Sequence, residues 1–244
     1  MAAFFIRRTM KIPISNRLLC CARQVPVGAH VADIGCDHGY LGIWLLKNGI
    51  AEFVTASDLR QQPLNKAKEN SLLYGTSEKM EFHVADGLCA VDPQKVDTIV
   101  CAGMGGDCIA HILDEAPWVR DQKYTLILQP QTSGNDLRRY LGENGFNIEG
   151  EQLVQDGGFL YFTVMARYGK GGPLTPGEQY LSKALLRCGS DLLPAYFDRI
   201  IRALQNTVEG IRRSRQPHEK LAYYETALTQ VLKMRDDYER SANS

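Results

Sequence analysis

The segment from Asp33 to Leu41 combines glycines with carboxylates, a mixture suited to holding a cationic ligand. It reads Asp-Ile-Gly-Cys-Asp-His-Gly-Tyr-Leu and follows a predicted strand at residues 31–34. Its glycines let the backbone approach a ligand closely at a strand-to-helix turn. A dinucleotide-binding loop has a second glycine where this chain has Asp37. A carboxylate there would repel a pyrophosphate but attract sulfonium and ammonium groups.

These residues predict a site for S-adenosylmethionine, and the alternative is a tight glycine turn without a ligand. The residues of this segment that we assign to the cofactor are Asp33, Gly35, Asp37, His38, Gly39 and Tyr40.

Two more carboxylates follow the next predicted strands. Asp58 ends the strand at 53–57, where it can accept hydrogen bonds from both ribose hydroxyls or, alternatively, cap the following helix. Asp86-Gly87 follows the strand at 80–84, where a carboxylate can accept from the adenine amino group or simply form a turn. Ligands of open α/β sheets bind at the carboxyl ends of strands, so these carboxylates together indicate a ligand site more strongly than any one of them does. We assign to the cofactor site Asp58, Leu59, Asp86 and Gly87.

Two further segments are predicted to line the pocket for the methyl acceptor. Gly103-Met104-Gly105-Gly106 follows the fourth predicted strand, and Gln129-Pro130-Gln131 follows the fifth. We expect Gly103, Met104 and Gly105 to lie near the cofactor, and Gln129 and Gln131 to hold the acceptor in a turn. The alternative is that Met104 only packs and that the glutamines are solvated turn residues.

The elements that must position these residues alternate between short apolar runs and helical patterns, which indicates a parallel sheet with helices on both faces. Further strands are predicted at 98–101 and 125–128, and helices near 40–48, 61–74, 106–115 and 133–144. Apolar runs at 146–154 and 159–165 then flank Asp156-Gly157-Gly158, a turn typical of a hairpin. Five alternating units and a hairpin predict the seven-stranded, Rossmann-like sheet of class I methyltransferases.

A change of composition at 169–173 marks the predicted boundary between a methyltransferase domain (1–170) and a helical domain (173–244). Thr175-Pro176-Gly177-Glu178 is a capping box that begins a helix. Two longer helices, at about 194–214 and 217–239, carry apolar residues at alternating spacings of three and four, which predicts an antiparallel coiled coil. Residues 1–12 are expected to be disordered.

Composition narrows the class of protein further. The chain has 244 residues and no net charge, and its seven cysteines show no zinc-site or disulfide spacing. No apolar run reaches the length of roughly 18 residues that a membrane span needs. We therefore expect a cytoplasmic protein without a metal. The first 30 residues hold five basic and no acidic residues, so a polyanion should contact the ends of the chain.

Several of these motifs resemble the bacterial tRNA (adenine-22-N1)-methyltransferase family. The resemblance covers about residue 14 to the C-terminus, and the segments that carry it are Ile14-Ser15-Asn16-Arg17-Leu18, Asp33–Leu41, Asp86-Gly87-Leu88, Ile99–Gly106 and Leu126-Ile127-Leu128-Gln129-Pro130. It implies methyl transfer from S-adenosylmethionine to N1 of an adenine in the D-arm region of tRNA. It also implies that Gln129 or Gln131 accepts a hydrogen bond from the N6 amine, and that Tyr40 or Met104 lies near the reacting centre.

Phosphate contacts are expected from the basic N-terminal segment and the tip of the helical hairpin, although such tips are often simply solvated. The residues that we assign to them are Arg7, Arg8, Lys11, Arg17, Arg212, Arg213, Arg215 and Lys220.

Two other functions remain open at this point. The chain could be a methyltransferase for another RNA or a small molecule, with the hairpin as a lid or dimer contact. It could instead bind S-adenosylmethionine without catalysis and recruit a partner. We expect a monomer or a weak dimer.

Overall fold

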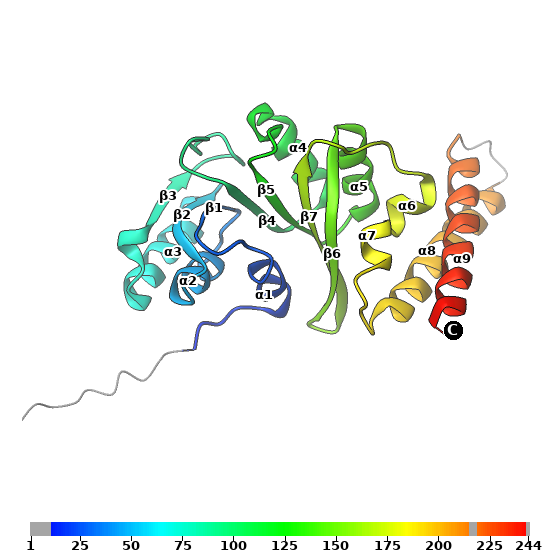
Figure 1. Cartoon of the computed structure of the whole chain (residues 1–244), viewed down its shortest axis with the longest axis horizontal. Helices are drawn as coiled ribbons and strands as arrows, with labels where there is room; N and C mark the ends of the chain where they lie inside the picture. Colours follow the sequence, from blue (N-terminus) through cyan, green and yellow to red (C-terminus); the bar gives the residue numbers. More distant parts are fainter. Residues whose placement is uncertain (1–10, 215–218, 243–244) are drawn as a thin grey trace, which may run out of the picture.

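The computed structural model of the chain describes residues 11–214 and 219–242 (Figure 1). A seven-stranded sheet forms its centre, in the order β3-β2-β1-β4-β5-β7-β6. Strand β7 is antiparallel to both of its neighbours, whereas the other pairs are parallel. The strands are β1 (Ala29–Ile34), β2 (Ala51–Asp58), β3 (Met80–Val84), β4 (Thr98–Met104), β5 (Thr125–Pro130), β6 (Phe146–Asp156) and β7 (Phe159–Tyr168). This arrangement confirms the predicted fold class.

Helices cover both faces of the sheet because the strands are apolar on both sides. Val100 and Ile127 pack with the cluster that contains residues of α1, α2 and α3, while Ile99 and Leu126 pack with the cluster of α4 and α5. This alternation follows the two-residue repeat of a strand. The helices are α1 (Asn16–Ala22), α2 (Tyr40–Lys47), α3 (Gln61–Tyr74), α4 (Gly106–Asp114) and α5 (Gly134–Glu143), with 3₁₀ turns η1 (Ser77–Lys79) and η2 (Pro117–Val119).

Strands β4 and β5 run further toward their carboxyl ends than the sequence predicts. Their pairing continues through Ala102 with Gln129 and Met104 with Pro130, and the Gln131 N–H donates to the Met104 carbonyl oxygen at 2.8 Å. The expected Gln-Pro-Gln turn is therefore wrong for its first two residues, because the ladder hydrogen bonds hold them in the sheet. Gln129 and Pro130 thus lie at a strand end.

Among the described residues, four helices follow the sheet: α6 (Pro176–Tyr180), α7 (Lys183–Leu186), α8 (Leu193–Ser214) and α9 (Leu221–Ala242). The capping box at Thr175 is present, with hydrogen bonds in both directions between Thr175 and Glu178. The last helix begins four residues later than predicted, because its first turn is closed by the hydrogen bond from the Tyr224 N–H to the Lys220 carbonyl oxygen.

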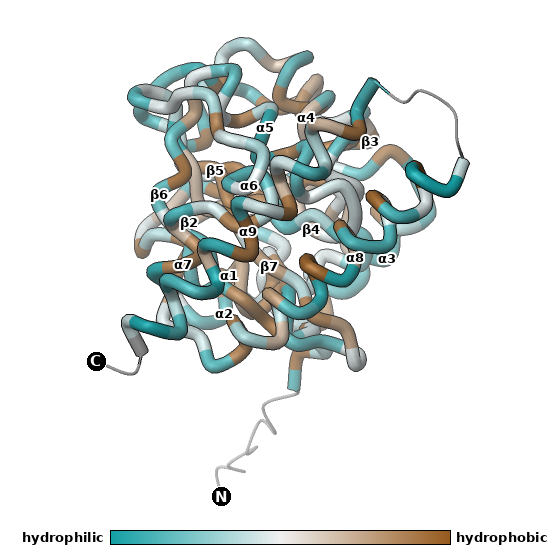
Figure 2. Tube along the Cα trace, turned by 90° about the vertical axis from the view of Figure 1, so that its right-hand side faces the viewer, coloured by the Kyte–Doolittle hydropathy of each residue, from teal (hydrophilic) through white to brown (hydrophobic). Residues whose placement is uncertain are grey.

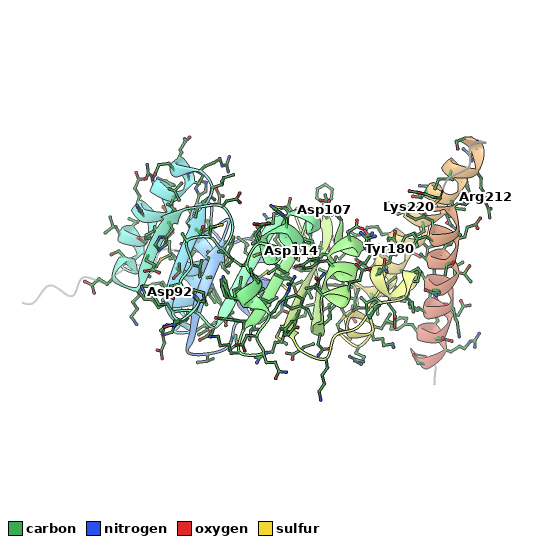
Figure 3. All side chains as sticks on the ribbon, turned by 90° about the horizontal axis from the view of Figure 1, so that it is seen from above. Asp92, Asp107, Asp114, Tyr180, Arg212 and Lys220 are labelled. Carbon is green, nitrogen blue, oxygen red and sulfur yellow. The ribbon has the colours of Figure 1, made fainter. Side chains whose placement is uncertain are left out.

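Helices α8 and α9 form an antiparallel pair. The ion pair between Arg235 and Asp198 (2.9 Å) joins the start of α8 to the end of α9, and the pair between Arg212 and Glu225 (2.6 Å) joins their opposite ends. Figure 3 shows Arg212 and Lys220 together at one end of this hairpin. Supercoiling of the pair as a coiled coil stays a prediction.

The C-terminal helices pack on the part of the chain that contains the sheet. Leu181, Phe197, Leu204 and Val231 belong to the same hydrophobic cluster as Leu126 on β5. In Figure 1 the helices α6 and α7 lie between the sheet and the pair formed by α8 and α9. Figure 2 shows hydrophobic colour along β5 and β7 in the interior and mixed colours on the outer helices. The two predicted domains, on either side of residues 169–173, therefore share one hydrophobic core.

A buried ion pair stands at this junction. The Arg138 guanidinium donates to both carboxylate oxygens of Glu151 at 2.7 and 3.0 Å, and both side chains are almost inaccessible to solvent. It also donates to the carbonyl oxygens of Gln179 and Tyr180 at 3.2 and 2.9 Å. Arg138 on α5 thus holds the end of α6 against the sheet. Figure 3 labels Tyr180, the last residue of α6.

Among the helices that the structure describes, none is both long enough and apolar enough to cross a bilayer. The described residues also include no group of three or more side chains arranged to hold a metal ion.

Candidate active site

A cavity of about 370 Å³ opens at the carboxyl edge of the sheet. It lies between α1, the loop after β1, and the ends of β2 and β4. The predicted site residues that line it are Asp33, Gly35, Asp37, His38, Tyr40, Asp58, Gly103 and Met104. Its size is within the range of small-molecule sites in proteins. The carboxylates predicted from the first two strand ends therefore lie around one space.

Asp33 is the most buried carboxylate of this cavity. It is 4% exposed, and its Oδ2 atom is buried without a hydrogen-bond partner among the described residues. Burial is the main cause that raises the pKa of Asp33 to about 7; a hydrogen bond from the Gly42 backbone lowers this pKa, and the nearby Asp58 carboxylate raises it. A buried carboxylate oxygen without a partner is costly, so it attracts a cationic or hydrogen-bond-donating ligand.

Asp58 at the end of β2 organises the loop that follows β1. Its Oδ2 accepts from the Asp37 N–H at 3.2 Å, and its Oδ1 accepts from the Arg60 N–H at 2.9 Å. Asp37 has a φ of 47°, in the left-handed region that few residues other than glycine adopt. The carboxylate of Asp58 thus holds this strained turn in place and still lines the cavity.

Gly39 begins α2 and lets this loop pack against α3. Its φ is 73°, and an added Cβ would lie 2.9 Å from the Ala67 Cβ. A side chain at this position would therefore push this loop away from α3. Gly39 is buried behind the loop and does not line the cavity.

Arg17, which we assigned to phosphate contacts, extends from α1 into the same cavity. Its Nη1 donates to the Gln129 Oε1 at 3.0 Å, and its Nε lies 3.5 Å from the Oδ2 of Asp156 at the end of β6. Gly103 makes room for it, since an added Cβ there would lie 2.8 Å from the Arg17 Nη1. Sequence reasoning missed this position, although the motif around Arg17 had been noticed.

The two glutamines differ in accessibility. Gln129 is fully buried, and its amide is used at both ends: Oε1 accepts from Arg17, and Nε2 donates to the Pro130 carbonyl oxygen at 2.9 Å. Gln131 is exposed and lines a second cavity of about 320 Å³ next to α5, β7 and α8. Of the two, Gln131 is therefore the side chain that a large acceptor can reach directly.

Besides Gly39, four predicted cofactor residues lie outside the lining of the main cavity. Asp86 and Gly87 line a separate cavity of about 100 Å³ with residues of α4, and Leu59 is 67% exposed at the end of β2. Gly105 is the N-cap of α4, and an added Cβ there would lie 3.2 Å from the Thr132 Oγ1. The structure places these residues along the same edge of the sheet but does not bring them into one pocket.

Thiol chemistry is not favoured at this site. Cys36 lines the cavity, and burial together with Asp33, Asp58 and Asp37 raises the pKa of its thiol. Burial likewise raises the pKa of Cys101 on β4. Both groups stay protonated at neutral pH and are poor nucleophiles.

Much of the predicted basic tip is already paired within the protein. Arg212 pairs with Glu225, and Arg213 pairs with Glu209 at 2.9 Å. Lys220 is exposed and has an interaction of its own. Lys11 is exposed, and its carbonyl oxygen accepts from the Tyr74 hydroxyl. The remaining predicted phosphate ligands, which lie outside the described residues, are Arg7, Arg8 and Arg215.

Comparison with known proteins agrees with this geometry. A family model described as a methyltransferase domain matches residues 14–164. The tRNA (adenine(22)-N(1))-methyltransferase of Bacillus subtilis is 31% identical over 159 residues, which cover 65% of this chain and 67% of that protein. The crystal structure of the B. subtilis m1A22 tRNA methyltransferase TrmK matches with a TM-score of 0.76 at 25% identity, over 94% of this chain and 99% of that one.

A Streptococcus pneumoniae protein, provisionally described as a tRNA (m1A22) methyltransferase and solved with S-adenosyl-L-methionine, matches with a TM-score of 0.73 at 28% identity. The match covers 89% of this chain and 97% of that one. The agreement thus extends from the sheet through the C-terminal helices. From the methyltransferase model and from relatives matched along most of their own length, the chain belongs to the tRNA (adenine(22)-N(1))-methyltransferase family.

Proposed function

We propose that the protein transfers the methyl group of S-adenosylmethionine to N1 of adenine 22 in the D-arm region of tRNA. The observation that carries the proposal is the cavity where Asp33, Asp37 and Asp58 lie together, in a chain of this family. It acts on tRNA in the cytoplasm, as a monomer or a weak dimer.

The charges around the cavity fit S-adenosylmethionine, which supplies an electrophilic methyl group on a sulfonium when bound. Asp33 offers an unpartnered buried oxygen to the cationic end of the cofactor, and Asp58 is placed to accept from ribose hydroxyls. Arg17 and Arg60 line the same cavity, and the Arg17 guanidinium suits the cofactor carboxylate. Carboxylates and arginines around one cavity match a ligand that carries both charges.

The protein needs no strong base for this reaction, because adenine N1 has an available lone pair at neutral pH. Its contribution is to hold the acceptor in line with the methyl group and to exclude water. N1 lies on the Watson–Crick edge, so the adenine must be unpaired or flipped out of its helix. We assign to Gln131 the hydrogen bond from the N6 amine, and to Gln129 the positioning of that strand end through Arg17. Tyr40 and Met104 lie nearest the reacting centre.

Incubation of the protein with an unmodified tRNA transcript and S-adenosylmethionine tests the proposal. Nucleoside mapping by mass spectrometry should find N1-methyladenosine at position 22, and a transcript with guanosine at that position should remain unmethylated there. Methylation at another position or of another RNA would contradict the assigned substrate. Cofactor binding without any methylated RNA would contradict the enzymatic proposal and favour a binding module. A small-molecule acceptor would show turnover insensitive to salt, whereas RNA binding weakens steeply as salt rises.

A further inference from the structure

A groove leads away from the acceptor side of the site along α8. The cavity that contains Gln131 continues past the start of β7 to Arg199 and Ala203, and a second hollow starts at these same two residues and extends to Arg202 and Asn206. The groove therefore connects the end of β5 to the middle of α8.

The groove carries positive charge that the protein does not neutralise. Arg199 donates to the Leu160 carbonyl oxygen and lies over the Tyr196 ring, 4.7 Å from its centroid. Within residues 11–214 and 219–242, neither Arg199 nor Arg202 forms an ion pair. The two arginines are three residues apart and therefore lie on the same side of α8.

Acidic groups near the groove are already engaged elsewhere. Asp198 lines the second hollow, but it pairs with Arg235 on α9 at 2.9 Å. The arginines nearer the tip of the hairpin differ from Arg199 and Arg202, because Arg212 and Arg213 pair with glutamates. The positive charges on α8 that have no counter-charge among the described residues are thus those of Arg199 and Arg202, beside the sheet. The described arginines of the tip are paired.

Aromatic side chains border the groove at its entrance. Tyr161 lines the first cavity, and its ring centroid lies 6.4 Å from that of Phe159, which is 68% exposed at the start of β7. Exposed aromatic rings beside a basic groove are typical of sites that bind unpaired nucleotides, because bases stack on them. A flipped acceptor leaves such unpaired neighbours close to the site.

We propose that this groove binds the sugar–phosphate backbone beside the acceptor nucleotide, with Arg199 and Arg202 as phosphate ligands and Phe159 and Tyr161 as a stacking surface. The proposal rests on the proposed function, since it takes the bound polyanion to be the substrate tRNA. Arg199 is presented by its bond to Leu160 and its contact with Tyr196, so little side-chain freedom is lost on binding.

The test uses three groove variants: Arg199→Gln, Arg202→Gln and the double variant that carries both changes. The control is Lys233→Gln, which removes one charge from the exposed side of α9 outside the groove. Each groove variant should raise the Kd for an unmodified tRNA transcript roughly two- to fivefold. Each single variant should also reduce the slope of log affinity against log salt by about 0.7 to 0.9, and the double variant by about twice as much. The KM for tRNA should rise while kcat stays nearly constant, as expected for a contact made equally before and during reaction.

Arg199→Lys and Arg202→Lys should restore much of the affinity, and all variants should bind S-adenosylmethionine as the wild type does. If the double variant keeps the tRNA affinity and the salt slope of the wild type, the proposal that the groove binds tRNA is wrong. Methylation of tRNA by the unaltered protein would still support the proposed function in that case. Failure of the unaltered protein to bind tRNA would remove both. An equal loss of affinity in Lys233→Gln would show that net charge, and not the groove, holds the RNA.

Discussion

At the scale of single residues, the ionisation of Asp33 links the cofactor site to pH. Burial raises its pKa to about 7 from an ordinary value of 3.8, and only the ionised form attracts a cation. Affinity for S-adenosylmethionine should therefore increase as pH rises from about 6 to 8 and then level off. Isothermal titration calorimetry should show this change in the wild type and lose it in Asp33→Asn, with exposed Asp236→Asn as control.

The same shift has the opposite effect on the stability of the free protein. The folded state holds the proton of Asp33 more tightly than the unfolded state, so this group makes the free energy of unfolding fall as pH rises from about 4 to 7. Asp33→Asn should remove that part of the fall. A cofactor affinity that is equally pH-dependent in Asp33→Asn would assign the effect to another group.

Asp58→Ala tests the second carboxylate of the site. Loss of a charge-assisted hydrogen bond to the ribose should weaken cofactor binding by about 1 to 3 kcal/mol. Because Asp58 also accepts from the Asp37 and Arg60 N–H groups, Asp58→Asn is the matched control that keeps one oxygen acceptor. Equal affinity in Asp58→Ala and wild type, measured by equilibrium titration, would exclude Asp58 from the ribose contact.

The sequence predicted which residues lie at the site, but it predicted their burial and their contacts less well. It placed Asp33, Asp37 and Asp58 correctly at one edge, because parallel strands bring their carboxyl ends together. It did not foresee that Gln129 is fully buried or that Arg17 enters the cavity, because both follow from contacts across 112 residues of chain. Long-range pairs of this kind leave no local spacing pattern.

At the scale of elements, the carboxyl ends of β4 and β5 show where pattern and structure separate. Glycine and proline are typical of turns, which is why the sequence predicted that both strands end early. Pairing of Met104 with Pro130 continues the ladder instead, and proline is tolerated here because the register shifts between Ala102 and Met104. The periodic apolar segments, in contrast, predicted α3 at Gln61–Tyr74 and β3 at Met80–Val84 with the bounds that the structure has.

The Arg138–Glu151 pair joins three elements, so its loss should be costly. Glu151→Gln leaves the guanidinium of Arg138 buried among α5, β6 and α6 without its counter-charge, which should lower the free energy of unfolding by about 3 to 5 kcal/mol. Chemical denaturation monitored by circular dichroism measures it. Glu149→Gln on the same strand removes a partly exposed partner of Arg167 and should cost less than about 1 kcal/mol. Similar losses in the two variants would mean that the buried pair adds little.

At the scale of the whole molecule, deletion of residues 173–244 tests the proposed domain boundary. The lining of the cofactor cavity comes from residues 17 to 104, so the shortened chain should still bind S-adenosylmethionine. It should lose most of its tRNA affinity and melt at a lower temperature, because residues of α8 and α9 share a hydrophobic cluster with β5. Thermal unfolding and tRNA titration of both chains measure these effects. An unchanged Tm would show that the two parts are independent.

The shared cluster also bears on how the chain folds during synthesis. The ribosome releases the complete sheet before α8 and α9, so Phe162 on β7 lacks its contact with the Tyr196 ring until α8 has emerged. Exposed apolar surface on a nascent chain invites aggregation and chaperone binding. Packing of the last helices therefore ends the period in which this surface is exposed. A ribosome that stalls shortly after residue 172 would leave a partly covered sheet that is prone to aggregation.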